Sequence, residues 1–292
     1  MEAGEMPEPA HVLTVAREAA RQVAAYHRAV TRTEVAREHK LDQHDIVTQH
    51  DRRSEEIATA ALREAFPDCR IVGEEFGVQP GEGEGEGLTF FIDPIDGTSN
   101  FVAGMPLFSV SIGAAIGGEL VAGVVNAAQL GHEFYAARGH GAWVESFDTD
   151  GPVRLGAPAE RGHEQCVVLT GFPNARDIRR WGPAGEDAAR ELQLNVMAVR
   201  NIGSTTLELA FVAAGWVDGC LGATAGPWDL AAGFALVQEA GGRLSHAPLL
   251  SEAPAQAIWD NPGYAASGPG RELEILHATL AELEDLAVGM RP

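Results

Sequence analysis

The stretch that decides the fold is Phe91-Ile92-Asp93-Pro94-Ile95-Asp96-Gly97-Thr98, which closes an apolar run with two aspartates three positions apart. The run begins at residue 88 and is typical of a buried strand. Pro94 stiffens the turn between the aspartates, so both carboxylates can be directed at one point. Gly97 and Thr98 can open a helix, whose first N–H groups would face an anion such as phosphate.

Other carboxylates follow short apolar or glycine-rich segments elsewhere in the chain. Glu74 and Glu75 follow Gly73 at the end of a β-type segment, and Asp229 follows Trp228 at an expected helix start. Carboxylate oxygens together with phosphate and water are the usual ligands of Mg²⁺. Taken singly, the aspartates could be helix N-caps and the glutamates surface charge. Taken together, they predict a magnesium site that faces a phosphate.

Composition narrows the class of protein and of partner. The chain has 292 residues, of which 45% are hydrophobic and 22% charged, as in ordinary globular proteins. It carries 21 basic and 42 acidic residues, a formal net charge of −21. This charge repels nucleic acid polymers and anionic membranes, so we expect neither as a partner. A small phosphate substrate would then need bound cations to reverse the local field.

Cysteine usage and hydropathy point to a compartment. The three cysteines, Cys69, Cys166 and Cys220, have no C-x-x-C spacing, which favours neither a disulfide framework nor a zinc site. The first ten residues lack the basic and apolar pattern of a signal peptide. The longest apolar run, residues 107–117, is shorter than the roughly 20 residues that span a bilayer. We therefore predict a cytoplasmic enzyme.

Periodicity predicts mixed α/β architecture in two halves. Helices are expected over residues 11–30 and 52–65, separated by a polar loop at 37–51, and a solvated loop is expected at 79–87. Strands are expected at 88–92, 107–116, 120–125 and 132–136. After a turn at 148–151, strands near 167, 199 and 217 alternate with helices near 186 and from 205 and 229. We place the boundary near 150, with an α+β half at 1–150 and an α/β half at 151–292 that contributes Asp229.

These segments together resemble the inositol monophosphatase family over most of the chain. The 93–98 block with Asn100-Phe101 is similar to the family's first signature, and Trp228-Asp229-Leu230-Ala231-Ala232-Gly233 with Glu239-Ala240-Gly241-Gly242 to its second. Residues 73–75 resemble its Gly-Glu-Glu element, and residues 45–51 its Asp-x-Val-Thr-x-x-Asp element. Lys40, the chain's only lysine, stands where the family often has one, although an ordinary surface lysine is an equal alternative.

The resemblance implies a layered α-β-α-β-α sandwich and a phosphoric monoester hydrolase that uses a metal-activated water. It assigns one Mg²⁺ to Glu74, Asp93 and the Ile95 carbonyl and a second to Asp93, Asp96 and Asp229, with a third, weaker ion near Glu74. Thr98 and Asp51 would orient the water, with Glu74 also in the catalytic set, and homodimers are common in the family. The implied substrate contacts are Gly97, Thr98, Ser204, Thr205, Gly222 and Lys40.

Two positions depart from the pattern and leave the substrate open. Gly222 stands where members that hydrolyse inositol phosphates have a glutamate that contacts the hydroxyls, and Thr205 replaces a small apolar residue. Loss of such a contact can change discrimination by orders of magnitude. A sugar, polyol or inositol monophosphate therefore competes with a nucleoside phosphate, 3′-phosphoadenosine 5′-phosphate or histidinol phosphate. A non-catalytic metal-binding homologue is the remaining alternative.

Overall fold

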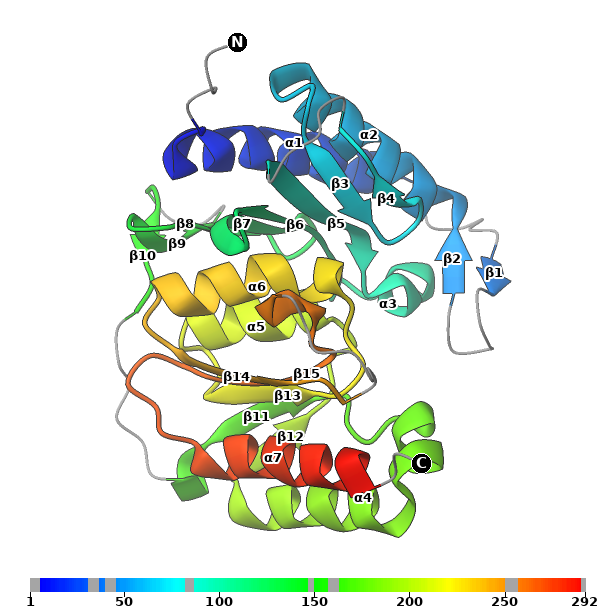
Figure 1. The fold of residues 1–292 in the computed structure, drawn as a ribbon, viewed down its shortest axis with the longest axis vertical. Helices are drawn as coiled ribbons and strands as arrows, with labels where there is room; N and C mark the ends of the chain where they lie inside the picture. The colour runs from blue at the N-terminus through cyan, green and yellow to red at the C-terminus, as the bar shows by residue number, and fades with distance from the viewer. Residues whose placement is uncertain are drawn as a thin grey trace.

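The computed structural model describes residues 6–30, 37–39, 46–81, 87–146, 150–156, 163–249 and 257–289. The described chain is arranged as five layers, α, β, α, β and α (Figure 1). This confirms the predicted α/β sandwich. Within the described residues, no helix combines the length and the apolar character needed to cross a bilayer.

The first sheet is mostly antiparallel, and only β3 and β5 run parallel. From one edge to the other it contains β10 (Val153–Arg154), β9 (Gly141–Ser146), β8 (His132–Ala137), β7 (Glu119–Ala127), β6 (Ser109–Ile116), β5 (Leu88–Asp96), β3 (Arg70–Gly73) and β4 (Gly77–Gln79). A separate pair, β1 (Arg37–His39) and β2 (Ile46–Thr48), is antiparallel. Because β3 and β5 are parallel neighbours, the residues that follow them emerge at the same edge of the sheet.

The second sheet is mixed. Its order is β12 (Ala198–Arg200), β11 (Val167–Thr170), β13 (Gly219–Gly222), β15 (Gly263–Ser267) and β14 (Arg243–Ala247). The pairs of β11 with β12 and with β13 are parallel, whereas β15 is antiparallel to both of its neighbours. Strand β10 comes after residue 150 but belongs to the first sheet. The division of the chain at residue 150 stays a prediction.

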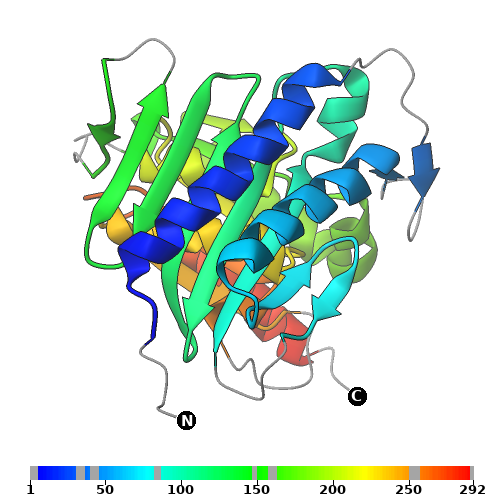
Figure 2. The same cartoon turned by 90° about the horizontal axis from the view of Figure 1, so that it is seen from above.

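The helices fill three layers. Figure 2 shows α1 (Pro9–Ala29) and α2 (Gln49–Ala65) side by side across the outer face of the first sheet. The middle layer holds α5 (Thr205–Ala213) and α6 (Pro227–Glu239), and the outer face of the second sheet carries α4 (Ala175–Asn195) and α7 (Glu274–Gly289) (Figure 1). The short elements are α3 (Thr98–Ala103) and the 3₁₀ turns η2 (His163–Gln165) and η3 (Ile258–Asp260).

The expected loop at 37–51 differs from the structure at both ends. Residues 37–39 and 46–48 pair as β1 and β2, and α2 begins at Gln49 rather than at 52. The reason lies in a capping box: the Asp51 carboxylate accepts from the backbone N–H of Thr48 at 2.8 Å, and the Thr48 hydroxyl accepts from the N–H of His50. These polar residues form the start of a helix. Composition alone does not distinguish a helix start from a loop.

Two glycines allow α6 to lie very close to the first sheet. A Cβ on Gly113 of β6 would lie 2.5 Å from the Cβ of Ala231, and one on Gly123 of β7 would lie 2.5 Å from the carbonyl oxygen of Ala232. Helix α6 is buried between the two sheets, which agrees with its apolar residues on all sides. Its first turn, which carries Asp229, is thereby fixed against the end of β5.

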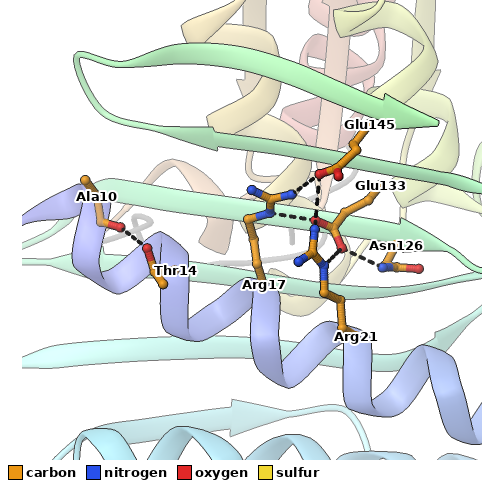
Figure 3. A network of polar contacts seen from close by, with 7 residues as sticks. All are labelled: Ala10, Thr14, Arg17, Arg21, Asn126, Glu133 and Glu145. Atoms are coloured by element: carbon orange, nitrogen blue, oxygen red, sulfur yellow. Dashed lines mark hydrogen bonds and ion pairs between the residues drawn. The ribbon is translucent and has the colours of Figure 1, made fainter. Parts of the chain in front are cut away.

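A polar network ties α1 to the far half of the same sheet (Figure 3). The Glu133 carboxylate on β8 accepts from Arg17 Nε at 2.6 Å, from Arg21 Nε at 2.9 Å and from Asn126 Nδ2 at 2.8 Å. Glu145 on β9 accepts from both arginines, at 2.5 and 3.1 Å. Glu133 is the buried centre of this network, whereas Arg21 and Glu145 are half exposed.

We expect Glu133→Gln to destabilise the fold by about 1–3 kcal/mol, because a buried amide would present N–H groups to two guanidinium groups. Urea unfolding with and without the substitution measures the loss. The matched control is Glu119→Gln, whose ion pair with Arg138 lies on the surface and should change stability by less than about 0.5 kcal/mol. Equal losses in the two variants would contradict a structural role for the network.

Candidate active site

Three aspartates from two distant segments meet at the junction of β5 and α6. Asp93 and Asp96 stand at the end of β5, and Asp229 is the third residue of α6. One carboxylate oxygen from each lies within 4.8 Å of those of the other two. Asp93 and Asp96 are only 2% and 8% exposed. The structure thus brings together three of the predicted metal ligands.

The electrostatics of this cluster favour a bound cation. Burial raises the pKa of Asp93 well above its usual range, and the negative charges of Glu74, Asp96 and Asp229 raise it further. Buried like charges are costly unless a cation or protons neutralise them. The donors are hard oxygens, which suit Mg²⁺ or a similar divalent ion better than a soft one. The residues present therefore fit a metal centre.

Asp96 is held in place by donors from the start of α5. Its Oδ2 accepts from the Ser204 hydroxyl at 2.5 Å, and from the backbone N–H and hydroxyl of Thr206 at 2.7 and 2.6 Å. The Thr206 hydroxyl is itself 2.7 Å from that of Ser109 on β6. Burial raises the pKa of Asp96, and these hydrogen bonds act in the opposite direction. The predicted substrate residue Ser204 thus has Asp96 as a hydrogen-bond partner.

Glu74 reaches the site from the strand next to β5. Gly73 is paired with Ile92, and the Glu74 N–H donates to the Ile92 carbonyl at 3.2 Å, so Glu74 emerges beside Asp93. Its carboxylate is outside the group of three within 4.8 Å, yet its charge acts on Asp93.

Glu55 on α2 holds the segment that carries Glu74 in place through hydrogen bonds. This carboxylate is fully buried and accepts from the backbone N–H groups of Glu75 at 2.7 Å and Phe76 at 3.2 Å. The contact is so close that a Cβ on Gly73 would lie 1.9 Å from Glu55 Oε1. Sequence reasoning missed Glu55. The available signal was a charged residue on the buried face of α2, in register with Asp51 and Leu62.

Thr98 and Asp51 form a hydrogen-bonded pair, as the family resemblance implied. The Thr98 hydroxyl is 3.1 Å from Asp51 Oδ1 and 3.0 Å from the Ile95 carbonyl oxygen. Asp51 is buried, and its other oxygen accepts from the Thr48 hydroxyl at 2.6 Å. The pair therefore lies directly beside the turn that carries Asp93 and Asp96.

The backbone conformation at position 97 and the close packing around it require a glycine. Its φ is +91°, and a Cβ would lie 2.9 Å from the Leu107 carbonyl oxygen and 3.2 Å from that of Gly203. The Asn100 side chain joins the same two segments, because its Nδ2 donates to the carbonyls of Leu107 at 2.6 Å and Ile202 at 2.7 Å. This packing holds the turn after β5 against the segment that leads into α5.

A cavity of about 150 Å³ opens from Asp229 toward the second sheet. The predicted substrate residues Ser204, Thr205 and Gly222 all line it. Gly222 leaves no free space, because a Cβ there would lie 2.4 Å from the ring and 2.9 Å from the hydroxyl of Tyr264. Tyr264 is buried, with 1% of its surface exposed, and was not singled out from the sequence. Lys40 lies outside the described residues.

Comparison with known proteins decides the family. The model of the inositol monophosphatase family matches residues 8–284. The chain belongs to the inositol monophosphatase family.

Several known proteins are similar to this chain over most of its length. The protein named Nus factor SuhB from Pseudomonas aeruginosa is 37% identical over 80% of this chain and 84% of its own length. The fructose-1,6-bisphosphatase/inositol-1-monophosphatase of Aquifex aeolicus is 34% identical over 68% and 71%. Among solved structures, the IMPase of Thermotoga maritima superposes with a TM-score of 0.73 at 30% identity, covering 93% of this chain and 96% of that one.

Family membership confirms the resemblance seen in the sequence and makes the chain a phosphatase, a phosphoric monoester hydrolase that acts on small-molecule phosphates. The family's enzymes are generally metal-dependent, and the cluster of three aspartates could bind a metal. The roles of the individual residues remain predictions.

The hydrogen bonds that Glu55 accepts lead to a prediction for metal binding. We expect Glu55→Gln to weaken metal activation by about 10- to 100-fold, because a partner that orients a ligand is typically worth that much. The Mg²⁺ concentration for half-maximal activity measures the effect. The control is Glu56→Gln, whose carboxylate pairs with Arg53 on the surface. An unchanged Mg²⁺ requirement in Glu55→Gln would remove Glu55 from the positioning of Glu74.

Proposed function

We propose that this phosphatase is Mg²⁺-dependent and hydrolyses a small-molecule monophosphate through a metal-activated water. The observation that carries the proposal is the convergence of two buried aspartates and the partly buried Asp229 beside a hydrogen-bonded Thr98–Asp51 pair and a polar cavity. The ligands would be Glu74, Asp93 and the Ile95 carbonyl for one ion, and Asp93, Asp96 and Asp229 for a second. A third ion near Glu74 belongs to the same proposal.

Mg²⁺, when bound, supplies positive charge that offsets the carboxylates and the phosphate, and lowers the pKa of water. The chain's own residues would orient the reactants. The Thr98 hydroxyl can donate to Asp51 Oδ1 and accept from a water, so that a proton leaving the water is held at this pair. Backbone N–H groups of Gly97 and Thr98 would hold phosphate oxygens beside it.

The leaving alcohol would enter the cavity beyond Asp229, against Ser204, Thr205 and Gly222. The Tyr264 ring fills the space in which a side chain at position 222 would stand. Inositol phosphate therefore lacks the contact that a glutamate at 222 would provide. Other polyol or sugar phosphates, nucleoside phosphates and histidinol phosphate remain candidates.

The proposed organisation places the two halves, 1–150 and 151–292, on either side of this site, with Asp229 supplied by the second. A homodimer, a cytoplasmic location and the lack of a nucleic acid partner stay predictions from sequence and family.

The direct test is phosphate release from inositol 1-phosphate, fructose 1,6-bisphosphate, histidinol phosphate, AMP and 3′-phosphoadenosine 5′-phosphate, each with Mg²⁺ and with chelator. We expect Mg²⁺-dependent release from at least one compound, and a loss of more than about a hundredfold in Asp93→Asn, because a ligand contributes more than its outer partners. Asp68→Asn, on the surface, is the control. Full activity in chelator or in Asp93→Asn would refute the metal assignment.

The Thr98–Asp51 pair can be tested separately. Thr98→Ala should lower kcat by about 10²–10⁴, the usual contribution of proton transfer by a positioned group, and leave KM nearly unchanged. Thr98→Ser keeps the hydroxyl and should restore most of the rate. If kcat is the same with alanine as with threonine, the hydroxyl does not act on the attacking water.

A further inference from the structure

The cavity beyond Asp229 has an unusual charge balance. Its lining includes the carboxyl groups of Asp177, Glu208 and Asp229, and none of the described residues that line it is basic. A second phosphate on the leaving group would therefore meet carboxyl groups, and no basic side chain among the lining residues would offset its charge. Since an unpaired buried charge is costly, the cavity favours a leaving group that carries no negative charge.

One carboxylate of this cavity, Asp177, has an incomplete set of hydrogen bonds. It is 1% exposed and stands in the first turn of α4, where its Oδ2 accepts from the Asn174 N–H at 2.9 Å. Its Oδ1 is buried and has no hydrogen-bond partner among the described residues. A buried acceptor without a partner is destabilising, and more so when it is charged, so a donor that binds to it would be stabilised.

The pKa of Asp177 is raised, because burial outweighs the Asn174 N–H and the charges of Arg176 and Arg180, which act in the opposite direction. A cation bound beside the carboxyl group would favour its charged form. The partial positive charge at the start of α4 acts in the same direction as these arginines. Neither arginine lines the cavity. Glu208 differs, because burial and the charge of Asp96 raise its pKa to about 8 and keep it largely neutral at pH 7.

We propose that the cavity selects a leaving alcohol that bears an ammonium group, and that Asp177 pairs with this group. This inference rests on the proposed phosphatase function and adds the chemical class of the substrate, a monophosphate of an amino alcohol. The ammonium group supplies both the donor that Oδ1 lacks and the positive charge that the lining lacks. Phe172 and Tyr264 complete the wall with rings, which tolerate a cation better than an anion.

The test compares pairs of substrates that differ in one group. Phosphate release is measured with Mg²⁺ for 2-aminoethyl, 3-aminopropyl and 4-aminobutyl phosphate and for the corresponding hydroxyalkyl phosphates, with fructose 1,6-bisphosphate as an anionic comparison. For at least one chain length we expect kcat/KM to be about tenfold or more higher with the amine, the ratio that 1.4 kcal/mol gives. Fructose 1,6-bisphosphate should be the poorest of these substrates.

A substitution at Asp177 then assigns the preference. Asp177→Asn retains an oxygen for the Asn174 N–H, so α4 keeps its cap, and it should remove the amine preference through KM while kcat is preserved. Asp187→Asn removes the same charge from the exposed side of α4 and should keep the preference. A purely structural role for Asp177 would lower activity toward both members of a pair alike.

Each outcome decides a different claim. If the wild-type enzyme cleaves both members of every pair equally, or if the preference survives in Asp177→Asn, the ammonium proposal is wrong and the phosphatase function stands. The wild-type comparison decides this even if the variant does not fold. If no monophosphate is hydrolysed with Mg²⁺, neither in these pairs nor in the panel above, the proposed function fails and the ammonium proposal with it.

Discussion

The close approach of α6 to the first sheet is the constraint on which the site depends. Gly113 and Gly123 remove the side chains that would separate the helix from β6 and β7, and Ala231 and Ala232 occupy the space. Protein interiors are packed densely enough that one added methyl group shifts its neighbours. The position of Asp229 relative to β5 therefore follows from residues that have no catalytic chemistry of their own.

The same geometry concentrates negative charge where the protein is least able to solvate it. Each aspartate is partly compensated by fixed dipoles: Asp96 by Ser204 and Thr206, Asp93 by the N–H of Ile95, and Asp229 by the N–H of Gly226. These contacts orient the carboxylates without neutralising them. Carboxylates that are oriented in advance in this way could bind a cation with little rearrangement.

The sequence was sufficient to predict the features that local patterns encode. It was not sufficient to predict contacts between segments that are distant along the chain. The 93–98 block and residues 228–233 gave the fold class and the aspartate cluster, because each signature carries its own turn or helix start. Glu55 was missed because its partners are backbone N–H groups some twenty residues away, which leave no trace in composition. Tyr264 was missed because β13 and β15 become neighbours only in the folded sheet, across 42 residues of chain.

The contact between Gly222 and Tyr264 also has a consequence for how specificity can evolve. A side chain at 222 requires the buried Tyr264 ring to move first, while loss of the ring alone opens an unfilled hole in the core. We therefore expect either single exchange to destabilise the protein, and the two together to restore its packing. Such epistasis would keep this lineage on its own substrates, even though it belongs to the same family of phosphatases as its relatives.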